Sequence, residues 1–312
     1  MRNLIYLTFV LALPLGHASS YKLPQSDCSD VDIRDKHPKL REHFSTPADQ
    51  GSIGWCYGYS AADLLSVEAG VALSPSHVSS IYNSSIRSSF FWKAAYDIRT
   101  LFTGREAYEG GFIGKALREA MEANPVCEHN RIDKYTHLIG MLEVAKLRIR
   151  NKEISHEVAC EIIQNSLPNI NIDTENFMSD FVSKNINDTL ESMLRQNCQT
   201  VSIPQKKTKV LYKPLLWGKK KYVNQVNNLL NAGKPLGVSY NVSHISDKLS
   251  GYHASTVIGR RWNNGRCEYN IRNTWGRLCE YKPGIECNQD DGSYWVKDED
   301  FYKLALNFTY LE

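Results

Sequence analysis

One stretch of the sequence limits the possible folds more than any other, and it runs from Asp49 to Ala62 with the letters DQGSIGWCYGYSAA. A polar loop rich in glycine leads to Cys56. From Tyr57 to Ala69 nearly every position is small, apolar or aromatic, and only Asp63 and Glu68 are charged. A helix with so little polar surface is a buried one. We therefore predict a central helix that begins at Cys56.

A cysteine in the first turn of such a helix has two interpretations. Most cysteines of this kind are core residues or halves of disulfides. The positive end of a helix dipole, however, favours the thiolate, which is the nucleophilic form of the side chain. The rest of the chain must decide between them.

The first residues predict export. Residues 1–20 resemble a secretory signal, with Arg2 at its positive start, an apolar core over Leu4–Leu15 and a cleavage site after Ala18. No later segment is apolar enough to span a membrane. We expect an exported protein without a membrane span. Its destination, whether secreted, periplasmic or a lysosome-like or vacuole-like compartment, depends on the source organism.

Export predicts that most of the eight cysteines form disulfides, because cysteines pair in an oxidising compartment. If Cys56 is a free nucleophile, seven remain, so at least one more is free or pairs between chains. We expect Cys279 to pair with Cys287. Cys127 is expected to pair with Cys160 or Cys198, and these alternatives stay open. No metal-binding spacing of cysteine or histidine is present, so no metal or cofactor is expected. The formal net charge of +3 is too small to indicate a nucleic-acid partner.

The character of the sequence changes along its length. After the signal (1–18) and an extended N-terminal arm (19–46), we expect a helical lobe (47–205) with a helical insertion over about 128–199. A β-rich lobe (206–312) follows. Its expected strands are 236–240, 253–258, 269–272, 293–296 and 308–310, with a hairpin turn at Asn264-Gly265. Helices followed by strands predict an α+β fold with two lobes.

The second half offers what a catalytic cysteine requires, namely a base, a group that orients the base, and donors for an oxyanion. His253 opens an apolar strand and is the candidate base. Asn273 follows another strand, and its side chain can accept a hydrogen bond from His253. The Gln50 side chain and the backbone N–H of Cys56 are candidate oxyanion donors. Trp275 is placed to cover the bond between His253 and Asn273.

The other histidines are expected on the surface. His244, nine residues before His253, is the rival base, and we expect it to be exposed. The same expectation applies to His37, His43, His77, His129, His137 and His156.

Taken together, these motifs resemble the papain-like cysteine peptidases. The resemblance rests on Gln50-Gly51 before Cys56-Tyr57, on Gly110-Gly111, on His253-Ala254 and on Asn273-Thr274-Trp275-Gly276, in that chain order. It implies a papain-like two-lobed fold, with the cysteine helix in the helical lobe and the histidine and asparagine in a β-barrel-like lobe. A cleft between the lobes would bind an extended peptide.

The resemblance also implies roles. Cys56 would be the nucleophile, His253 the general base and acid, Asn273 the orienting residue and Gln50 an oxyanion donor. Gly110-Gly111 would pair with the substrate backbone. A peptide or protein substrate is the expected partner, and the sequence leaves specificity and oligomeric state open.

Several features depart from the family pattern. Ile53 stands where the family often has a cysteine, and Trp55, Tyr57 and Glu109 also differ. Cys56 and His253 are 253 − 56 = 197 residues apart, beyond the usual separation of about 130–150. The helical insertion accounts for the excess. The interval from Ser19 to Pro47 is too short for the long helical prosegment of typical secreted members.

The sequence thus predicts an exported cysteine peptidase that hydrolyses peptide bonds through a thioester on Cys56. Two alternatives stay open. One is a papain-fold binding protein that has lost its activity, and the other is a transpeptidase that passes the same thioester to an amine.

Overall fold

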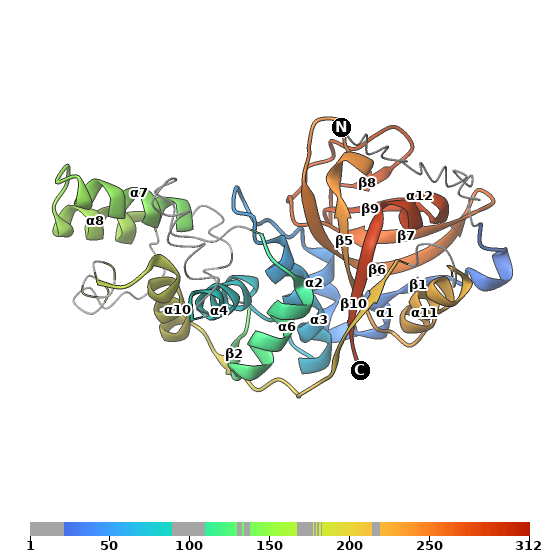
Figure 1. The fold of residues 1–312 in the computed structure, drawn as a ribbon, viewed down its shortest axis with the longest axis horizontal. Coiled ribbons are helices and arrows are strands. Elements are labelled where there is room, and N and C mark those ends of the chain that lie inside the picture. Colours follow the sequence, from blue (N-terminus) through green and yellow to red (C-terminus); the bar gives the residue numbers. More distant parts are fainter. Residues whose placement is uncertain are drawn as a thin grey trace, which may run out of the picture.

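A computed structural model describes residues 22–88, 110–129, 133, 138–166, 177, 179, 181, 183–213 and 219–312 (Figure 1). The signal segment 1–18 lies outside these residues. In the described part of the chain, no helix combines the length and the apolar character that crossing a membrane requires.

The cysteine helix is present where the sequence predicts it. Helix α3 spans Cys56–Ala69, and every residue from Cys56 to Ser66 is buried. It ends at Gly70, whose φ of 70° is left-handed. Next comes α4 (Pro75–Ser88), where Ser74 Oγ accepts a hydrogen bond from the N–H of His77 at 3.1 Å, as an N-cap does. Helix α6 spans Ile113–Glu122.

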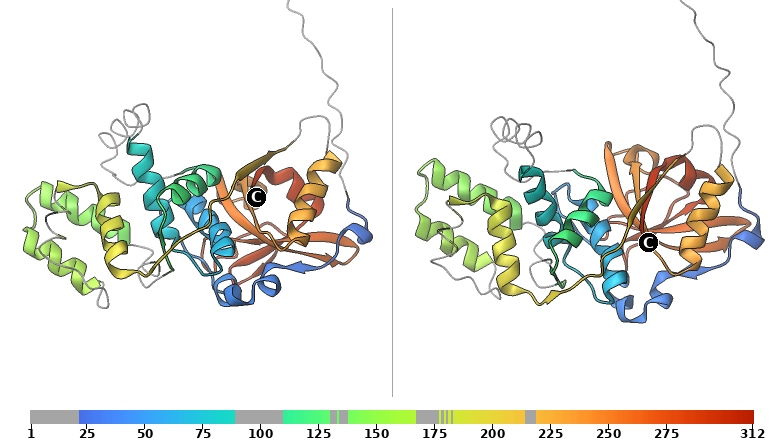
Figure 2. Two further views of the ribbon diagram at one scale, coloured as in Figure 1. Left: turned by 90° about the horizontal axis from the view of Figure 1, so that it is seen from below. Right: turned by 60° about the horizontal axis from the view of Figure 1, so that its bottom comes forward.

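The expected insertion is helical in its described residues. It contains α7 (Leu138–Arg150), α8 (His156–Ser166) and α10 (Ile186–Asn197). At its base, β2 (Val126–Cys127) pairs with β3 (Thr200–Val201), and a disulfide joins Cys127 to Cys198. Figure 2 shows α7 and α8 at the end of the molecule farthest from the large sheet.

The second half forms one antiparallel sheet. The strands follow the order β4-β10-β5-β6-β7-β9-β8, and β1 pairs with β6. Their bounds are β4 (Thr208–Tyr212), β5 (Leu236–Asn241), β6 (Tyr252–Asn263), β7 (Arg266–Arg272), β8 (Glu286–Asn288), β9 (Ser293–Lys297) and β10 (Ala305–Leu311). Helices α11 (Lys219–Asn231) and α12 (Asp298–Leu304) belong to the same lobe. The β6–β7 turn has positive φ at Asn264 and Gly265, as the Asn-Gly pair predicts.

Two hydrophobic cores confirm the predicted α+β fold with two lobes. The first is formed mainly by α3, α4, α6 and the insertion helices. The second lies under the sheet with α11 and α12. In Figure 1 the helical lobe and the sheet stand side by side, with α3 between them.

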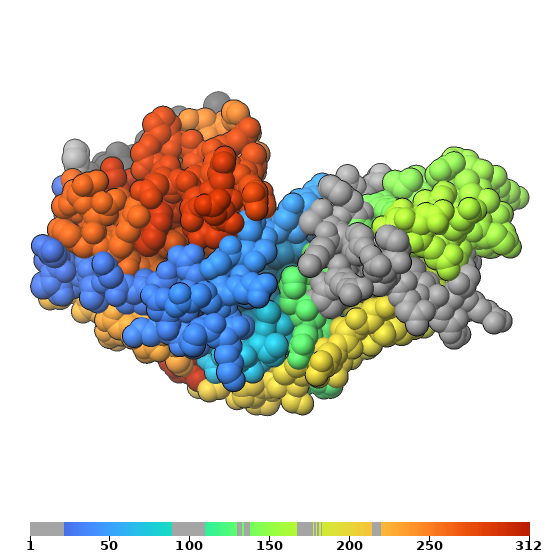
Figure 3. Space-filling view, turned by 180° about the vertical axis from the view of Figure 1, so that it is seen from behind, coloured from blue at the N-terminus to red at the C-terminus, as the bar shows by residue number. Residues whose placement is uncertain are grey.

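The predicted extended arm was wrong in its secondary structure. Its described residues form β1 (Val31–Asp32), α1 (Ile33–Lys36), α2 (Arg41–Ser45) and two short 3-10 turns. Ile33 and Phe44 are completely buried in the second core, and Cys28 is bonded to Cys267. A few apolar residues in a polar segment find partners more than 200 residues away, which no local pattern reveals. Figure 3 shows this segment, in blue, lying along the β-rich lobe.

Of the histidines expected at the surface, His77 is buried and His43 is partly buried, while His137 lies outside the described residues. His77 is completely buried, and its Nδ1 accepts a hydrogen bond from the N–H of Cys127 at 2.9 Å. His43 Nε2 lies 2.8 Å from a carboxylate oxygen of Asp63. Each has a polar partner from a distant segment, which makes burial possible.

The remaining cysteines follow the prediction in part. Cys279 is bonded to Cys287, as expected. Cys56 and Cys160 are buried outside the three disulfides.

Candidate active site

Hydrogen bonds join helix α3, which begins at Cys56, to strand β6, which contains His253. Ser60, one turn after Cys56, donates its hydroxyl to the carbonyl of Ser255 at 3.0 Å. Ser255 lies two residues after His253 on β6. Ala254, the neighbour of His253, lines the same cavity as Cys56. The nucleophile candidate and the base candidate therefore line one cavity although 197 residues separate them.

A buried ion pair reinforces this junction. Arg272, at the end of β7, donates to both carboxylate oxygens of Asp63 on α3, at 3.1 and 3.0 Å. Thr256 of β6 donates to the same carboxylate at 2.9 Å. Asp63 is 2% exposed and Arg272 is 4% exposed. Burial would raise the pKa of Asp63, but Arg272 and His43 outweigh it and hold this pKa below its usual value.

Sequence reasoning missed this junction. Its signal was visible, because Asp63 is one of only two charged residues in an otherwise apolar helix. A charge in a buried helix requires a partner. That partner, Arg272, is the residue immediately before Asn273.

His253 and Asn273 form the hydrogen bond that the sequence led us to expect. His253 Nε2 lies 2.7 Å from Asn273 Oδ1, and both side chains are buried. The same oxygen accepts a bond from the N–H of Thr274 at 2.8 Å, which identifies it as the carbonyl end of the amide. The Trp275 ring is inclined by 33° to the His253 ring, with 4.5 Å between their centroids. Trp275 therefore covers this bond.

Gln50 joins the loop before Cys56 to the loop after β7. Its Oε1 accepts a hydrogen bond from the Thr274 hydroxyl at 2.6 Å, and its backbone N–H donates to the Thr274 carbonyl at 2.9 Å. Its Nε2 donates to the Ile53 carbonyl at 2.6 Å. An amide nitrogen carries two N–H bonds, so one is available to an oxyanion. That role for Gln50 stays a prediction.

Gly110 and Gly111 have structural reasons of their own to be glycine. Gly110 has a φ of 86°, and its N–H donates to the Gly54 carbonyl in the loop before Cys56 at 2.8 Å. A Cβ on Gly111 would lie 2.8 Å from the Tyr57 ring, which is too close. The left-handed backbone accounts for Gly110 and close packing against Tyr57 of α3 accounts for Gly111, while substrate pairing stays a prediction.

Four of the predicted site residues line one cavity of about 620 Å³ between the lobes. Its rim is apolar, since Phe112 is 70% exposed and Tyr252 is 80% exposed. Three predicted site residues do not line this cavity, namely Gln50, Asn273 and Trp275. The residues that line the cavity are Cys56, Tyr82, Ile86, Gly110, Gly111, Phe112, Lys115, Ser239, Tyr252, His253, Ala254, Leu306 and Asn307.

Burial favours the uncharged forms of the Cys56 thiol and the His253 imidazole. It raises the pKa of the Cys56 thiol, against the opposing hydrogen bonds from the backbone N–H groups of Ala254 and Tyr57 and from its own. It also lowers the pKa of His253 to about 4, although the bond to Asn273 acts in the opposite direction. The sequence predicted that the helix dipole favours the thiolate. In the structure, burial outweighs that effect.

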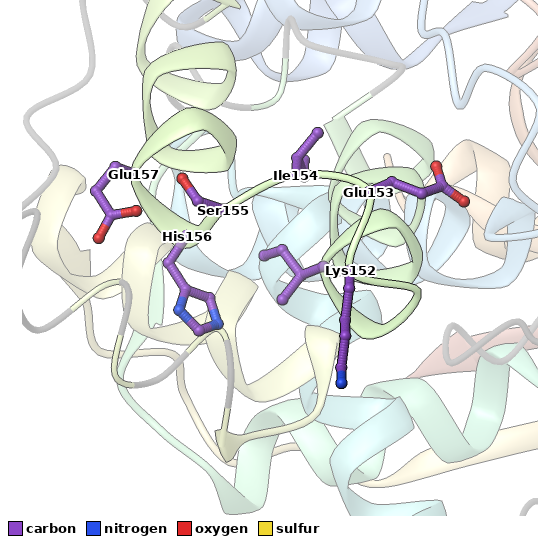
Figure 4. Close-up of a pocket in the computed structure, with 7 residues that line it drawn as sticks. Lys152, Glu153, Ile154, Ser155, His156 and Glu157 are labelled. Atoms are coloured by element: carbon purple, nitrogen blue, oxygen red, sulfur yellow. The ribbon is translucent and has the colours of Figure 1, made fainter.

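Two other hollows have no cysteine among the described residues that line them, and one of them, of about 700 Å³, is lined by residues that include His43, Asp63 and Arg272. A cavity of about 420 Å³ lies at the turn between α7 and α8, and its lining comes from the short segment 149–157 (Figure 4). His244, the rival base, is exposed in a 3-10 turn (Val242–His244), as predicted. Among the residues that the structure describes, no three His, Cys, Asp or Glu side chains gather as metal ligands would.

No protein-family model matches this sequence, and no curated protein is similar to it. Solved structures do resemble this chain in the course of the backbone. Procathepsin B S9 from Trypanosoma congolense has 14% identity and a TM-score of 0.44, with 98% of this chain and 85% of that chain covered. The digestive procathepsin L 3 of Tenebrio molitor larval midgut has 14% identity and a TM-score of 0.44, with 94% and 71% covered.

The bromelain protease from Ananas comosus, in complex with the inhibitor E64, has 12% identity and a TM-score of 0.42, with 93% of this chain and 99% of that chain covered. Similarity at this level transfers neither an activity nor a residue's role. The resemblance of this chain to the papain-like cysteine proteases is one of fold.

Proposed function

We propose that this protein is a cysteine peptidase that cleaves peptide bonds through a thioester on Cys56. One observation supports the proposal above all others. His253, which is held by its buried bond to Asn273, lines the same cavity as Cys56, a cysteine outside the three disulfides.

The geometry defines how the proton would move. When Nε2–H of His253 donates to Asn273 Oδ1, the imidazole is held in the tautomer whose Nδ1 is an acceptor. Nδ1 would then take the thiol proton as Cys56 Sγ attacks the carbonyl carbon of the substrate. The resulting imidazolium would give the proton to the leaving amine, and water would hydrolyse the thioester.

Burial opposes separate charging of either group. Transfer of a proton from thiol to imidazole creates an anion and a cation together in one poorly solvated cavity, where their attraction is stronger than in water. The Asn273 oxygen stabilises the imidazolium through the bond at 2.7 Å. The oxyanion of the tetrahedral intermediate would accept hydrogen bonds from two donors. These are the backbone N–H of Cys56, at the start of α3, and the second side-chain N–H of Gln50.

Alkylation of Cys56 tests the base. We would measure the rate of iodoacetamide labelling from pH 4 to pH 9 in wild type and in His253→Ala, and map the modified sites by mass spectrometry. An ordinary thiol reacts as it ionises near pH 8.5. We expect Cys56 to react well below that pH in wild type and to lose this reactivity in the variant. Cys160 provides the internal comparison and should be the same in both proteins.

Peptide hydrolysis tests the reaction itself. A peptide library should be cleaved by wild type and left intact by Cys56→Ala. Labelling of Cys56 without cleavage would favour the inactive binding protein, and formation of new peptide bonds with an added amine would favour the transpeptidase. Slow labelling near pH 8.5 that is unchanged in His253→Ala would contradict the proposal.

We also propose that the protein is exported. Three disulfides support this, because such bonds persist in oxidising compartments. Mass spectrometry of the mature protein should find an N-terminus at Ser19, and an N-terminus at Met1 would contradict export by this signal.

A further inference from the structure

The nitrogen end of the Asn273 amide has a partner of its own. Asn273 Nδ2 donates to the hydroxyl oxygen of Tyr281 at 2.7 Å. The oxygen end already binds His253 and the N–H of Thr274, and the Ser255 hydroxyl lies 3.4 Å from it. Tyr281 therefore holds the nitrogen end of the amide, which these three contacts do not reach.

Tyr281 is fixed within a short loop closed by the Cys279–Cys287 disulfide. Its neighbour Lys282 donates its N–H to the Ile245 carbonyl at 2.8 Å and its Nζ to the Ser243 carbonyl at 2.7 Å. Within the lobe, the Tyr281 ring packs against Tyr294 with 4.5 Å between centroids. The hydroxyl is therefore attached to a well-anchored segment.

The Tyr281 hydroxyl also has a suitable chemical state. Burial raises its pKa, with the Asn273 bond acting in the opposite direction, so it stays protonated across the physiological range. A neutral hydroxyl can accept from the amide N–H without placing a charge beside His253.

We propose that Tyr281 is a positioning residue for the catalytic pair, and that the Cys279–Cys287 loop is the device that holds it. This inference rests on the proposed function, since Tyr281 acts through Asn273 on His253. By preventing rotation of the amide, Tyr281 keeps the carbonyl oxygen on His253 Nε2. That oxygen raises the pKa of the imidazolium, so its displacement lowers this pKa.

Tyr281→Phe tests the proposal because it removes the hydroxyl and keeps the ring. We expect kcat to fall by about 5-fold to 10-fold with little change in KM, the effect of one lost hydrogen bond. We also expect the acid limb of the kcat/KM profile to move to lower pH, because His253 then takes up the proton that disables it as a base only at a lower pH. A role limited to folding would not move that limb.

Two further variants sharpen the test. Tyr302→Phe is the matched control. It removes a buried hydroxyl in the same lobe whose oxygen lies 2.7 Å from the hydroxyl oxygen of Tyr269 and has no hydrogen bond to Asn273. It should leave kcat and the pH profile unchanged. Cys279→Ser with Cys287→Ser should reproduce the effect of Tyr281→Phe.

A second readout does not depend on catalysis. NMR of protein labelled with ¹⁵N-asparagine reports the exchange of the Asn273 side-chain amide protons, which should be faster in Tyr281→Phe than in wild type or Tyr302→Phe. If wild type cleaves no peptide but this difference is found, the proposed function fails and the positioning role stands. Equal exchange in all three proteins, or an unmoved acid limb in active protein, would overturn the inference.

Discussion

The buried ion pair between Asp63 and Arg272 provides the most demanding prediction. Asp63→Asn keeps the size and shape of the side chain and removes its charge. Arg272 then remains as a buried cation, 4% exposed, without its counter-charge. Loss of one partner from a buried pair costs about 3–5 kcal/mol of unfolding free energy.

That cost converts to a measurable shift. With a urea m-value of about 3 kcal/mol per M, the midpoint of unfolding should fall by about 1–1.7 M. The matched control is Asp35→Asn, because Asp35 pairs with Arg41 at 2.7 Å on the surface, where their side chains are 67% and 59% exposed. An exposed pair contributes about 0–1 kcal/mol, so its midpoint should hardly move.

The same variant tests how the site is assembled, since Asp63 joins α3 to β6 and β7. Alkylation of Cys56 should lose part of its dependence on His253 in Asp63→Asn and retain it in Asp35→Asn. Asp63→Leu combined with Arg272→Met should recover most of the lost stability, because no unpaired charge stays buried. Equal urea midpoints for Asp63→Asn and Asp35→Asn would refute the reasoning.

Three further predictions concern pH, close packing and the N-terminal segment. The folded state holds His253 and His77 neutral, each with a pKa of about 4, whereas the unfolded chain binds protons near pH 6.5. Stability should therefore fall as the pH drops from about 6.5 to about 4, by roughly 3 kcal/mol per histidine, and urea unfolding of His77→Gln should show a smaller fall. Gly111→Ala should lower the free energy of unfolding by about 1–3 kcal/mol, because the new Cβ would be too close to the Tyr57 ring. Gly140→Ala is the control and should be neutral or stabilising, because a Cβ there meets nothing within 4 Å. Equal changes of melting temperature in the two variants would contradict this prediction. Cys28→Ser with Cys267→Ser should lose about 2–5 kcal/mol and expose residues 22–45 to limited proteolysis, and an unchanged digestion pattern would show that the disulfide does not hold this segment.

Local patterns in the sequence predicted the elements that depend on neighbouring residues. The apolar run after Cys56 predicted α3, and Asn264-Gly265 predicted the β6–β7 turn. The base and its orienting residue were also within reach, because His253 and Asn273 stand at the ends of strands that are clear in the sequence. Their mutual bond at 2.7 Å follows from the pairing of those strands.

Contacts between residues far apart in the sequence could not be predicted from local patterns. Ile33 and Phe44 stand in a polar segment, and only the sheet shows what buries them. Asp63 was noticed as a charge, but its partner Arg272 lies 209 residues away. Cys28–Cys267 likewise joins segments that share no local pattern.

The sequence by itself therefore determined the α+β character, the cysteine helix and the identities of the candidate catalytic residues, because periodicity, turn chemistry and residue type are local properties. Only the tertiary structure decided that Cys56 and His253 share a cavity, that Tyr281 holds Asn273, and that burial favours the uncharged thiol and imidazole. Such features depend on which distant segments exclude water from a side chain. Desolvation and long-range pairing are set by the packed chain as a whole.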